Sequence, residues 1–324
     1  MAISRRSFLE SVPLLAAQAA LAAETDKKTG MPTRVLGKTG ARVSVLGFGC
    51  GSRLLSYNEE AKAAEALNRG IELGITYLDT AYGYGSGKSE SWVGGVIKGR
   101  RQGLWITTKV QDRKADVAMR TVEGSLKRLG TDHLDLIHIH ALGDAADLAQ
   151  IEAADGVLKV MYKLREQKVT RFIGVTCHSD PVTLKAALER HDFDCTQMAL
   201  NAALSGMANG RGRMIMNRTL PASFEHQALP VALKKKMGIT AMKVYAQEGL
   251  VGTAPLNKLL SYSLSLPVAA AVVGMPQLEH IDENVKLAKA FKPLSGSEMR
   301  ELSGKLSQEH KARLDAFFAT HIDA

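Results

Sequence analysis

The chain has 324 residues, of which 45% are hydrophobic and 23% are charged, a balance that excludes a disordered or fibrous protein. The formal net charge is +9, but the basic residues are scattered, and the one tight cluster, residues 234–236, has no aromatic residues beside it. Because a nucleic-acid groove gathers its basic residues on one face, this pattern argues against nucleic acid as a partner. We interpret the charge as a solvated basic surface, whose field also favours an anionic cofactor.

The first 30 residues have the features of an export signal. Arg5 and Arg6 lie in the twin-arginine motif SRRSFL, an uncharged apolar stretch follows at residues 12–23, and residues 20–22 read ALA, a cleavage pattern. The apolar run is shorter than the ~20 residues that span a bilayer. An amphipathic first helix is the alternative, against which Pro13 argues.

We therefore expect residues 1–30 to be a twin-arginine signal peptide and linker, and residues 31–324 to form a single domain. The twin-arginine translocation machinery would carry this domain to the periplasm. Because that machinery moves folded proteins, typically with a cofactor already loaded, the leader is a first indication of the chemistry.

After the leader, short β-branched runs alternate with amphipathic helical stretches. Nearly continuous apolar strands indicate a parallel sheet buried on both faces, and eight strand–helix units in about 250 residues are typical of an α/β (β/α)8 TIM barrel. Strands are predicted at residues 43–47, 76–79, 104–109, 134–140, 172–176, 195–200, 239–244 and 269–274. Examples of the helices predicted between them are residues 59–73, 89–98, 117–129, 156–166, 181–190 and 278–290.

Two glycine-rich segments resemble nucleotide-binding motifs without completing them. The segment GFGCGS begins like a dinucleotide fingerprint, but Ser52 stands where the third glycine belongs, which argues against a doubly wound sheet. The segment YGYGSGKS ends like a P-loop, but Tyr82 stands where its first glycine belongs. We interpret the residues around Gly87 as the glycine-rich start of a helix that includes Ser89 and Glu90.

Four polar residues mark the ends of three successive predicted strands. Asp79 closes the second strand with Tyr84 in the loop beyond it, Lys109 closes the third strand, and His140 closes the fourth. In this fold the chemistry gathers at the C-terminal ends of the strands, so these side chains can converge. His138 faces the same way as His140, but it lies deeper, and we expect it to be structural.

This quartet is suited to protonating an oxygen atom. A phenol has a pKa near 10, and a neighbouring lysine cation favours the phenolate, so Lys109 would lower the pKa of Tyr84. Asp79 would hold Lys109 charged and oriented, and His140 would donate a hydrogen bond to a carbonyl oxygen. The quartet would thus protonate the oxygen of a carbonyl group while hydride reaches its carbon.

Metal chemistry has no comparable signal. The three cysteines, Cys50, Cys177 and Cys195, form no metal-ligating motif with histidines, so we predict no metal site. Their number is odd, so at least one stays free within the chain.

The sequence resembles the aldo-keto reductase family from Arg34 to about Ala290. The segments RVLGKTG and LGFG resemble its opening, and DTAYGYG with Lys109 and His140 resembles its catalytic motifs in type and order. The resemblance implies that Tyr84 is the general acid and that Asp79, Lys109 and His140 complete the catalytic set. It also implies a nicotinamide cofactor lying across the barrel mouth and a small carbonyl or sugar substrate.

The resemblance also implies a set of residues that contact the cofactor. GVTC stands where the family has GVSN, so Thr176 offers a hydroxyl, and Cys177 replaces an amide. Gln197 would hold the nicotinamide carboxamide, Met242 would pack on the ring, and Lys243 would contact the pyrophosphate, although a rim lysine also occurs without a ligand. The remaining contacts implied by the resemblance are Gly49, Cys50, Asp79, Gly274, Met275, His280, Glu283 and Asn284.

The adenosine end of the cofactor leaves alternatives open. Met275 and His280 stand where the family often has basic residues that grip a 2′-phosphate, and family habit favours NADP(H) over NAD(H). Glu283 and Asn284 are also explained as a helix cap. The predicted loop at residues 246–255 is short and the tail beyond residue 293 is helical and polar, so we expect an open mouth.

Two other functions remain as alternatives. A Schiff-base lyase would use Lys109 as its nucleophile, although a nearby Asp79 would keep that amine protonated. An exported small-molecule-binding protein would retain the four residues without turnover.

Overall fold

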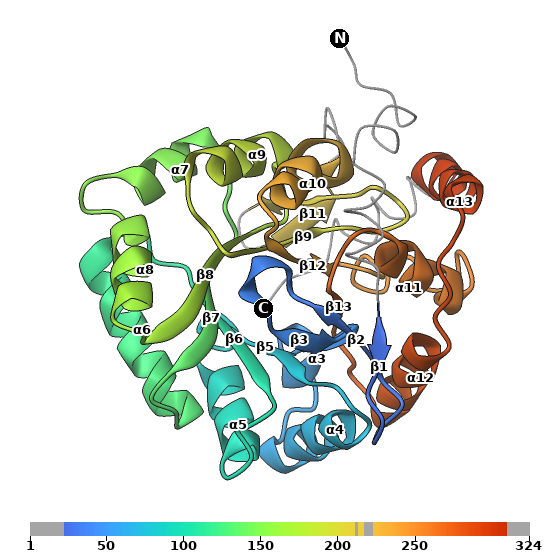
Figure 1. Cartoon of the computed structure of the whole chain (residues 1–324), viewed down its shortest axis with the longest axis horizontal. Coiled ribbons are helices and arrows are strands. Elements are labelled where there is room, and N and C mark those ends of the chain that lie inside the picture. Colours follow the sequence, from blue (N-terminus) through green and yellow to red (C-terminus); the bar gives the residue numbers. More distant parts are fainter. Residues whose placement is uncertain (1–22, 211–212, 217–222, 310–324) are drawn as a thin grey trace.

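The computed structural model describes residues 23–210, 213–216 and 223–309. Residues 1–22 of the predicted signal peptide and linker (residues 1–30) lie outside the described residues. Within the described part, eight strands close into a barrel in the order β12–β13–β4–β5–β6–β7–β8–β9 (Figure 1). These strands are β4 (Leu46–Gly49), β5 (Tyr77–Asp79), β6 (Trp105–Val110), β7 (Leu134–Ile139), β8 (Thr170–Cys177), β9 (Cys195–Ala199), β12 (Gly238–Met242) and β13 (Ala270–Val273).

Every neighbouring pair in the barrel is parallel, and the pairing of Ala271 with Leu46 closes the ring. All residues of β6 and β7 are buried, as expected for strands covered by side chains on both faces. The predicted (β/α)8 barrel is confirmed.

The first predicted strand was placed wrongly. Val43 belongs to β3 (Arg42–Ser44), which pairs antiparallel with β2 (Pro32–Val35), and the barrel strand β4 begins only at Leu46. The chain turns at Ser44, whose hydroxyl donates to Leu46 O at 2.7 Å, and no glycine or proline marks that turn in the sequence. The short strand β1 (Glu24–Thr25) pairs with β2, so this sheet includes residues assigned above to the linker.

Helices surround the barrel on its outside (Figure 1). In α6, every third or fourth residue is buried against the sheet, and the helix ends at Gly130 in the left-handed conformation. Among the described helices, none is long and apolar enough to cross a membrane. The helices are α3 (Ser52–Leu55), α4 (Glu60–Glu72), α5 (Lys88–Ile97), α6 (Ala115–Leu129), α7 (Ala145–Glu152), α8 (Val157–Glu166), α9 (Pro181–Arg190), α10 (Phe224–Lys234), α11 (Leu256–Ser265), α12 (Leu278–Lys289) and α13 (Gly296–Glu309).

Six of these helices match the predicted windows closely, namely α4, α5, α6, α8, α9 and α12. Helix α5 begins at Lys88, directly after Gly87, so the interpretation of GSGKS as the start of a helix is confirmed. The described part of the tail, residues 294–309, contains the helix α13, as expected.

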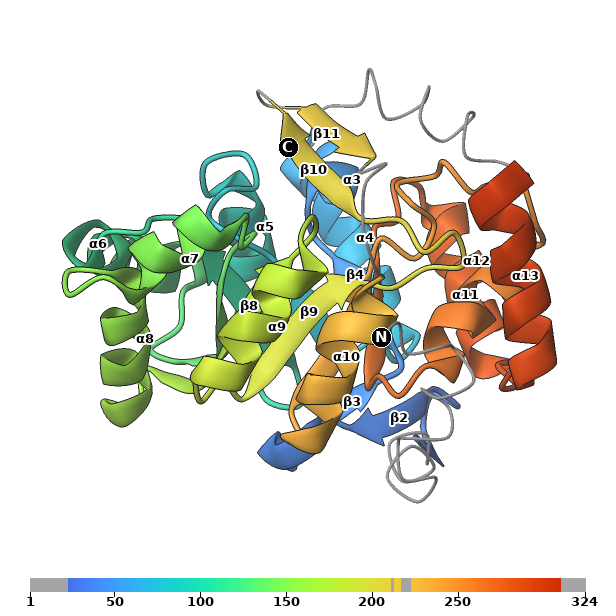
Figure 2. The same ribbon diagram turned by 90° about the horizontal axis from the view of Figure 1, so that it is seen from above.

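The N-terminal segment closes one end of the barrel. Leu36 is fully buried among Tyr77, Trp105 and Leu136 inside the barrel. Gly37 has φ = 51°, and a Cβ there would collide with the backbone of Met237, so this close approach requires glycine. Figure 2 shows β2 and β3 at this end and the hairpin β10 (Met207–Gly210)–β11 (Arg213–Met216) at the other. The sequence did not predict this hairpin.

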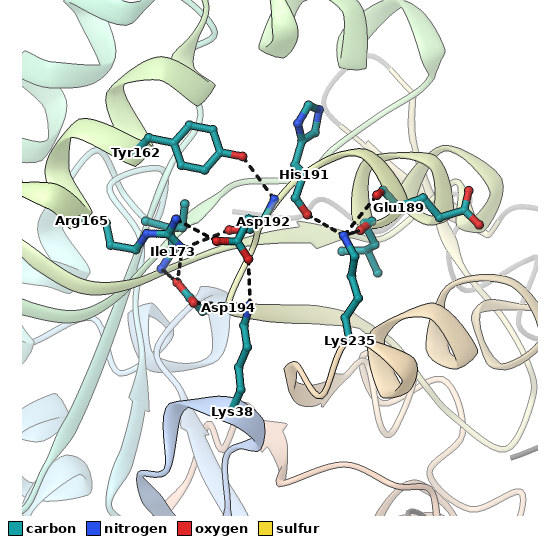
Figure 3. A network of polar contacts seen from close by, with 10 residues as sticks. Lys38, Tyr162, Arg165, Ile173, Glu189, His191, Asp192, Asp194 and Lys235 are labelled. Atoms are coloured by element: carbon teal, nitrogen blue, oxygen red, sulfur yellow. Dashed lines mark hydrogen bonds and ion pairs between the residues drawn. The ribbon is translucent and has the colours of Figure 1, made fainter. Parts of the chain in front are cut away.

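The N-terminal segment acts as a plug, and we call the end of the barrel that it closes the plugged end. A network of ion pairs joins several elements there (Figure 3). Lys38, in the 3₁₀ turn Gly37–Thr39, donates to Asp192 Oδ1 at 2.9 Å. Arg165 of α8 donates to Asp194 Oδ2 at 3.0 Å, and the same oxygen accepts the backbone N–H of Ile173 at 3.0 Å. The network therefore joins the N-terminal plug, a helix and a barrel strand at the end opposite to the strand C-termini.

We expect Asp194→Ala to lower the free energy of unfolding by about 2 kcal/mol, because the buried N–H of Ile173 and the guanidinium of Arg165 lose their acceptor. Equilibrium urea denaturation measures this change. The control is Asp116→Ala, which removes an exposed ion pair with Arg120 and should leave the midpoint almost unchanged. If Asp194→Ala unfolds at the wild-type midpoint, the network does not stabilise the plug.

Candidate active site

A cavity of about 240 Å³ opens at the C-terminal ends of the barrel strands. Its wall includes Asp79, Tyr84 and His140, together with Gln197 and Met242 from the far side of the barrel. The N-terminal plug closes the opposite end, so this mouth is where the fold leaves polar side chains accessible to a ligand.

Lys109 lies beneath the cavity and joins Asp79 and Tyr84 of the predicted quartet. Its Nζ donates to Asp79 Oδ2 at 2.8 Å, to Thr80 O at 2.9 Å and to Tyr84 OH at 3.2 Å. An ammonium group has three N–H donors, so each of them has an acceptor. Lys109 is 1% exposed and Asp79 is 3% exposed, so the ion pair is sheltered from water.

The register of the sheet explains this convergence. Asp79 is the last residue of β5 and pairs with Thr107 of β6, and Lys109 follows two positions later, on the same face of the strand. Lys109 in turn pairs with His138 of β7, so His140 lies one step higher at the mouth. Three neighbouring strands thus deliver their polar residues to one point.

The surroundings of Lys109 keep it charged. Burial lowers the pKa of Lys109, but the Asp79 carboxylate and the Tyr84 oxygen outweigh this effect, so the pKa lies above its usual value. Lys109 is therefore an ammonium group at neutral pH. It also lies 4.7 Å from the centre of the Tyr84 ring.

His140 packs edge-on against Tyr84, with 5.6 Å between the ring centres. Burial lowers the pKa of His140 well below its ordinary value, and the nearby Lys109 cation lowers it further. A neutral imidazole carries one N–H donor and one acceptor, so the ring can donate to a carbonyl oxygen. The Nδ1 atom of His140 is buried and has no hydrogen-bond partner among the described residues.

His138 lies inside the barrel, as the sequence predicted. It is fully buried, and neither ring nitrogen has a hydrogen-bond partner among the described residues. A Cβ at Gly174 of β8 would collide with its ring, so this histidine fills the barrel interior beside the smallest residue type.

Part of the predicted cofactor set lies in the cavity wall. Gly49, Gln197, Met242, Lys243 and Gly274 line the cavity together with Asp79. The amide of Gln197 donates to Asp79 Oδ2 at 3.3 Å, so it is held beside the quartet. These six residues therefore share one cavity with Tyr84 and His140.

The structure places four other residues of that set in the protein interior: Cys50, Thr176, Cys177 and Met275 are described and buried, and they do not line the cavity. Thr176 Oγ1 accepts the backbone N–H of Ala141 at 2.8 Å, and Cys177 Sγ donates to Leu142 O at 3.1 Å. Burial raises the pKa of Cys177 to about 12, so this thiol is neutral. Both residues brace the loop that follows His140.

Three residues of α12 also lie away from the cavity wall. Glu283 is exposed and His280 is half-buried, and neither lines the cavity at the strand ends. Asn284 accepts the hydroxyl of Tyr245 at 2.7 Å and donates to His280 O. Tyr245 lines the cavity, so Asn284 is connected to the cavity wall through the Tyr245 side chain that it holds.

The sequence missed several cavity residues, including Arg53, Gln111, His178, Tyr245 and Glu248. Gln111 and His178 directly follow β6 and β8, so the rule that chemistry gathers at strand ends could have found them. Arg53 forms an ion pair with Glu248 at 3.2 Å across 195 residues of chain, and the sequence carried no signal for that pairing.

The structure describes all three cysteines, and none forms a disulfide. Among the described residues, no group of three His, Cys, Asp or Glu side chains is placed to hold a metal ion.

Comparisons with known proteins agree with this geometry. The chain matches the Aldo/keto reductase family over residues 45–251. It is 27% identical over 319 residues to the uncharacterized oxidoreductase YqkF of Bacillus subtilis, covering 86% of this chain and 98% of the relative. It is 26% identical over 281 residues to methylglyoxal reductase YeaE of Escherichia coli, covering 80% and 90% of the two chains.

A solved structure gives the same result. The aldo-keto reductase of Klebsiella pneumoniae in complex with NADPH has a TM-score of 0.67 and 25% identity, covering 84% of this chain and 94% of that one. Since the family match spans more than half of the sequence, the chain belongs to the aldo/keto reductase family.

Proposed function

We propose that this protein reduces the carbonyl group of a small aldehyde or ketone, or oxidises the corresponding alcohol or sugar, with a nicotinamide cofactor. The observation that carries this proposal is the hydrogen bond of 3.2 Å between Lys109 Nζ and the Tyr84 hydroxyl at the cavity. A phenol held by a buried ammonium group is suited to giving a proton to a carbonyl oxygen.

The residues present fit a nicotinamide cofactor. Met242, Val272 and Val273 form an apolar stretch of the cavity wall beside the Gln197 amide, which suits a flat ring with a carboxamide. Arg53 and Lys243 bring two cations to the same cavity, which suits a pyrophosphate.

Tyr84 would act as the general acid of the reduction. It gives its proton to the carbonyl oxygen, and the Lys109 ammonium stabilises the phenolate that remains. Asp79 holds Lys109 in place, and neutral His140 donates a hydrogen bond to the same carbonyl oxygen. The cofactor, when bound, supplies the hydride for the carbonyl carbon.

We favour NADP(H) over NAD(H). The solved relative named above was crystallised with NADPH. The methylglyoxal reductase relative suggests small carbonyl compounds for a first substrate panel. The geometry argues against a Schiff-base lyase, because all three N–H groups of Lys109 have acceptors and a protonated amine is not a nucleophile.

Tyr84→Phe should lower kcat/KM for carbonyl reduction by about 1,000-fold while cofactor affinity stays unchanged, since only the proton donor is lost. Oxidation of the reduced cofactor with a panel of carbonyl compounds measures the rate. Tyr162→Phe is the control, because its hydroxyl lies in the network at the plugged end. An active Tyr84→Phe enzyme would remove Tyr84 from its role, and tight sugar binding without turnover by the wild type would favour a binding protein.

The buried histidines should make stability depend on pH. Their folded pKa values are depressed, so below an ordinary value of about 6.5 the unfolded chain binds protons that the folded chain does not. The contribution of these histidines to the free energy of unfolding is fully present above that pH. It is lost as the pH falls, by up to about 1.4 kcal/mol per pH unit for each histidine. Urea denaturation at several values between about pH 7 and 5 measures how the free energy of unfolding depends on pH. Its decrease with falling pH should be smaller for His138→Leu than for the wild type, and equal decreases would contradict this account.

We further propose that the protein is exported to the periplasm with its cofactor already bound, because a free nicotinamide pool is not expected there. Replacing Arg5 and Arg6 by lysines should retain the protein in the cytoplasm, as fractionation followed by immunoblotting would measure. Mass spectrometry of the native exported protein should find the bound dinucleotide and identify it as NADP or NAD. Efficient export of the double-lysine variant would contradict the twin-arginine route, and exported protein without cofactor would contradict loading before transport.

A further inference from the structure

The first turn of α5 buries two polar side chains that the proposed reaction does not use. Ser89 and Glu90 are both 0% exposed. They follow the loop that carries Tyr84, and Ser89 is the last residue of the segment GSGKS, which resembles the end of a phosphate-binding loop. Their contacts indicate a different purpose.

Ser89 joins the start of the helix to two strand ends. Its hydroxyl donates to Cys50 O at 2.6 Å and is 2.7 Å from the hydroxyl of Thr80, which must be the donor because Ser89 has only one proton to give. Cys50 directly follows β4, and Thr80 directly follows Asp79 of β5. The carbonyl of Thr80 also accepts from Lys109, so Ser89 is two contacts away from the ammonium group.

Glu90 joins the same turn to the third strand. Its Oε1 accepts the hydroxyl of Thr108 at 2.5 Å. Thr108 precedes Lys109 in β6, so the two side chains leave the strand on opposite faces. Glu90 therefore holds β6 from the outside of the barrel, at the residue next to the one that carries the ammonium group.

Arg128 of α6 completes the arrangement. Its Nε donates to Glu90 Oε2 at 2.7 Å, and its guanidinium lies 4.8 Å from the centre of the Tyr82 ring, in the loop that carries Tyr84. A Cβ at Gly87 would touch the Arg128 side chain, so the loop packs directly on it. The turn is thus fixed both to the strands and to the loop.

A buried carboxylate at this point is poorly explained by stability alone. Desolvation offsets much of the attraction in a buried ion pair, so apolar packing could stabilise the helix as well. Directed hydrogen bonds add fixed geometry, because each bond restricts the distance and angle between two elements. Here the elements are those that carry Asp79, Tyr84 and Lys109.

We propose that Ser89 and Glu90 are positioning residues for proton transfer: they set the distance between Tyr84 and Lys109 without touching substrate or cofactor. This inference rests on the proposed function. It assigns the second half of the segment DTAYGYGSGKSE to the same machinery as the first half.

The kinetic test uses Ser89→Ala and Glu90→Gln. Both should lower kcat by about 10- to 100-fold with KM and cofactor affinity little changed, because the phenol is displaced while the cavity is intact. The alkaline limb of the pH profile of kcat should also move. Ser89→Thr keeps a hydroxyl and should restore most of kcat.

Asp135→Asn is the matched control. Asp135 is a buried carboxylate that accepts from Arg101 at 2.6 Å and from the backbone N–H of Ile106 at 2.9 Å, at the start of β7, far from the mouth. It should lower stability and leave kcat and its pH profile unchanged. Folded Ser89→Ala and Glu90→Gln enzymes with wild-type kcat would overturn the proposal. If Glu90→Gln does not fold, Ser89→Ala and its rescue by threonine decide.

A second measurement does not need turnover. The absorbance of tyrosinate is measured as a function of pH in each variant. Subtracting the same titration of that variant with Tyr84→Phe added leaves the signal of Tyr84, and hence its pKa. That pKa should change in Ser89→Ala and Glu90→Gln and stay at the wild-type value in Asp135→Asn. If the wild type reduces no carbonyl compound, the proposed function fails, yet this titration still decides whether the two residues position Tyr84. An unchanged pKa in both variants would overturn the inference.

Discussion

The ammonium group of Lys109 is the constraint on which the rest of the site depends. Taking such a charge out of water costs several kcal/mol, and only a partner set with good geometry offsets that cost. Lys109 is 1% exposed, and its three acceptors come from β5 and from the loop beyond it. The strand ends must therefore keep a fixed relation to one another, because a displaced acceptor would leave a buried charge uncompensated.

The two ends of the barrel have different roles: one is tied by ion pairs, and the other holds the buried ammonium group and the cavity. At the plugged end, charged side chains pair with one another, as in the network of Lys38, Arg165 and Asp194 (Figure 3). At the mouth, Asp79 Oδ1 is buried without a hydrogen-bond partner among the described residues. Backbone strain gathers there too, since Lys243 and three residues at 246–248 have positive φ. Such groups are tolerated where a firmly tied scaffold holds them.

The sequence predicted the barrel and the convergence of Asp79, Tyr84, Lys109 and His140, because apolar strand runs and polar strand ends are local signals. It could not separate β3 from β4, since the turn at Ser44 has no marker residue. It also could not show that the side chain of Cys177 is directed to Leu142 O instead of the cavity, because that depends on how the following loop packs. Pairings such as Arg53 with Glu248 arise only when the barrel closes.

The two departures from the family motif GVSN, at residues 176 and 177, lie outside the quartet. Thr176 and Cys177 both hold the loop after His140, a task for which a hydroxyl and a neutral thiol are sufficient. The Gln197 amide remains in the cavity wall, bonded to the carboxylate oxygen that also holds Lys109. A protein that only bound sugars would gain little stability from a buried ammonium–carboxylate pair, since desolvation offsets its attraction. A pair that stabilises a phenolate during turnover has a physical reason to be there, so the geometry favours catalysis over binding alone.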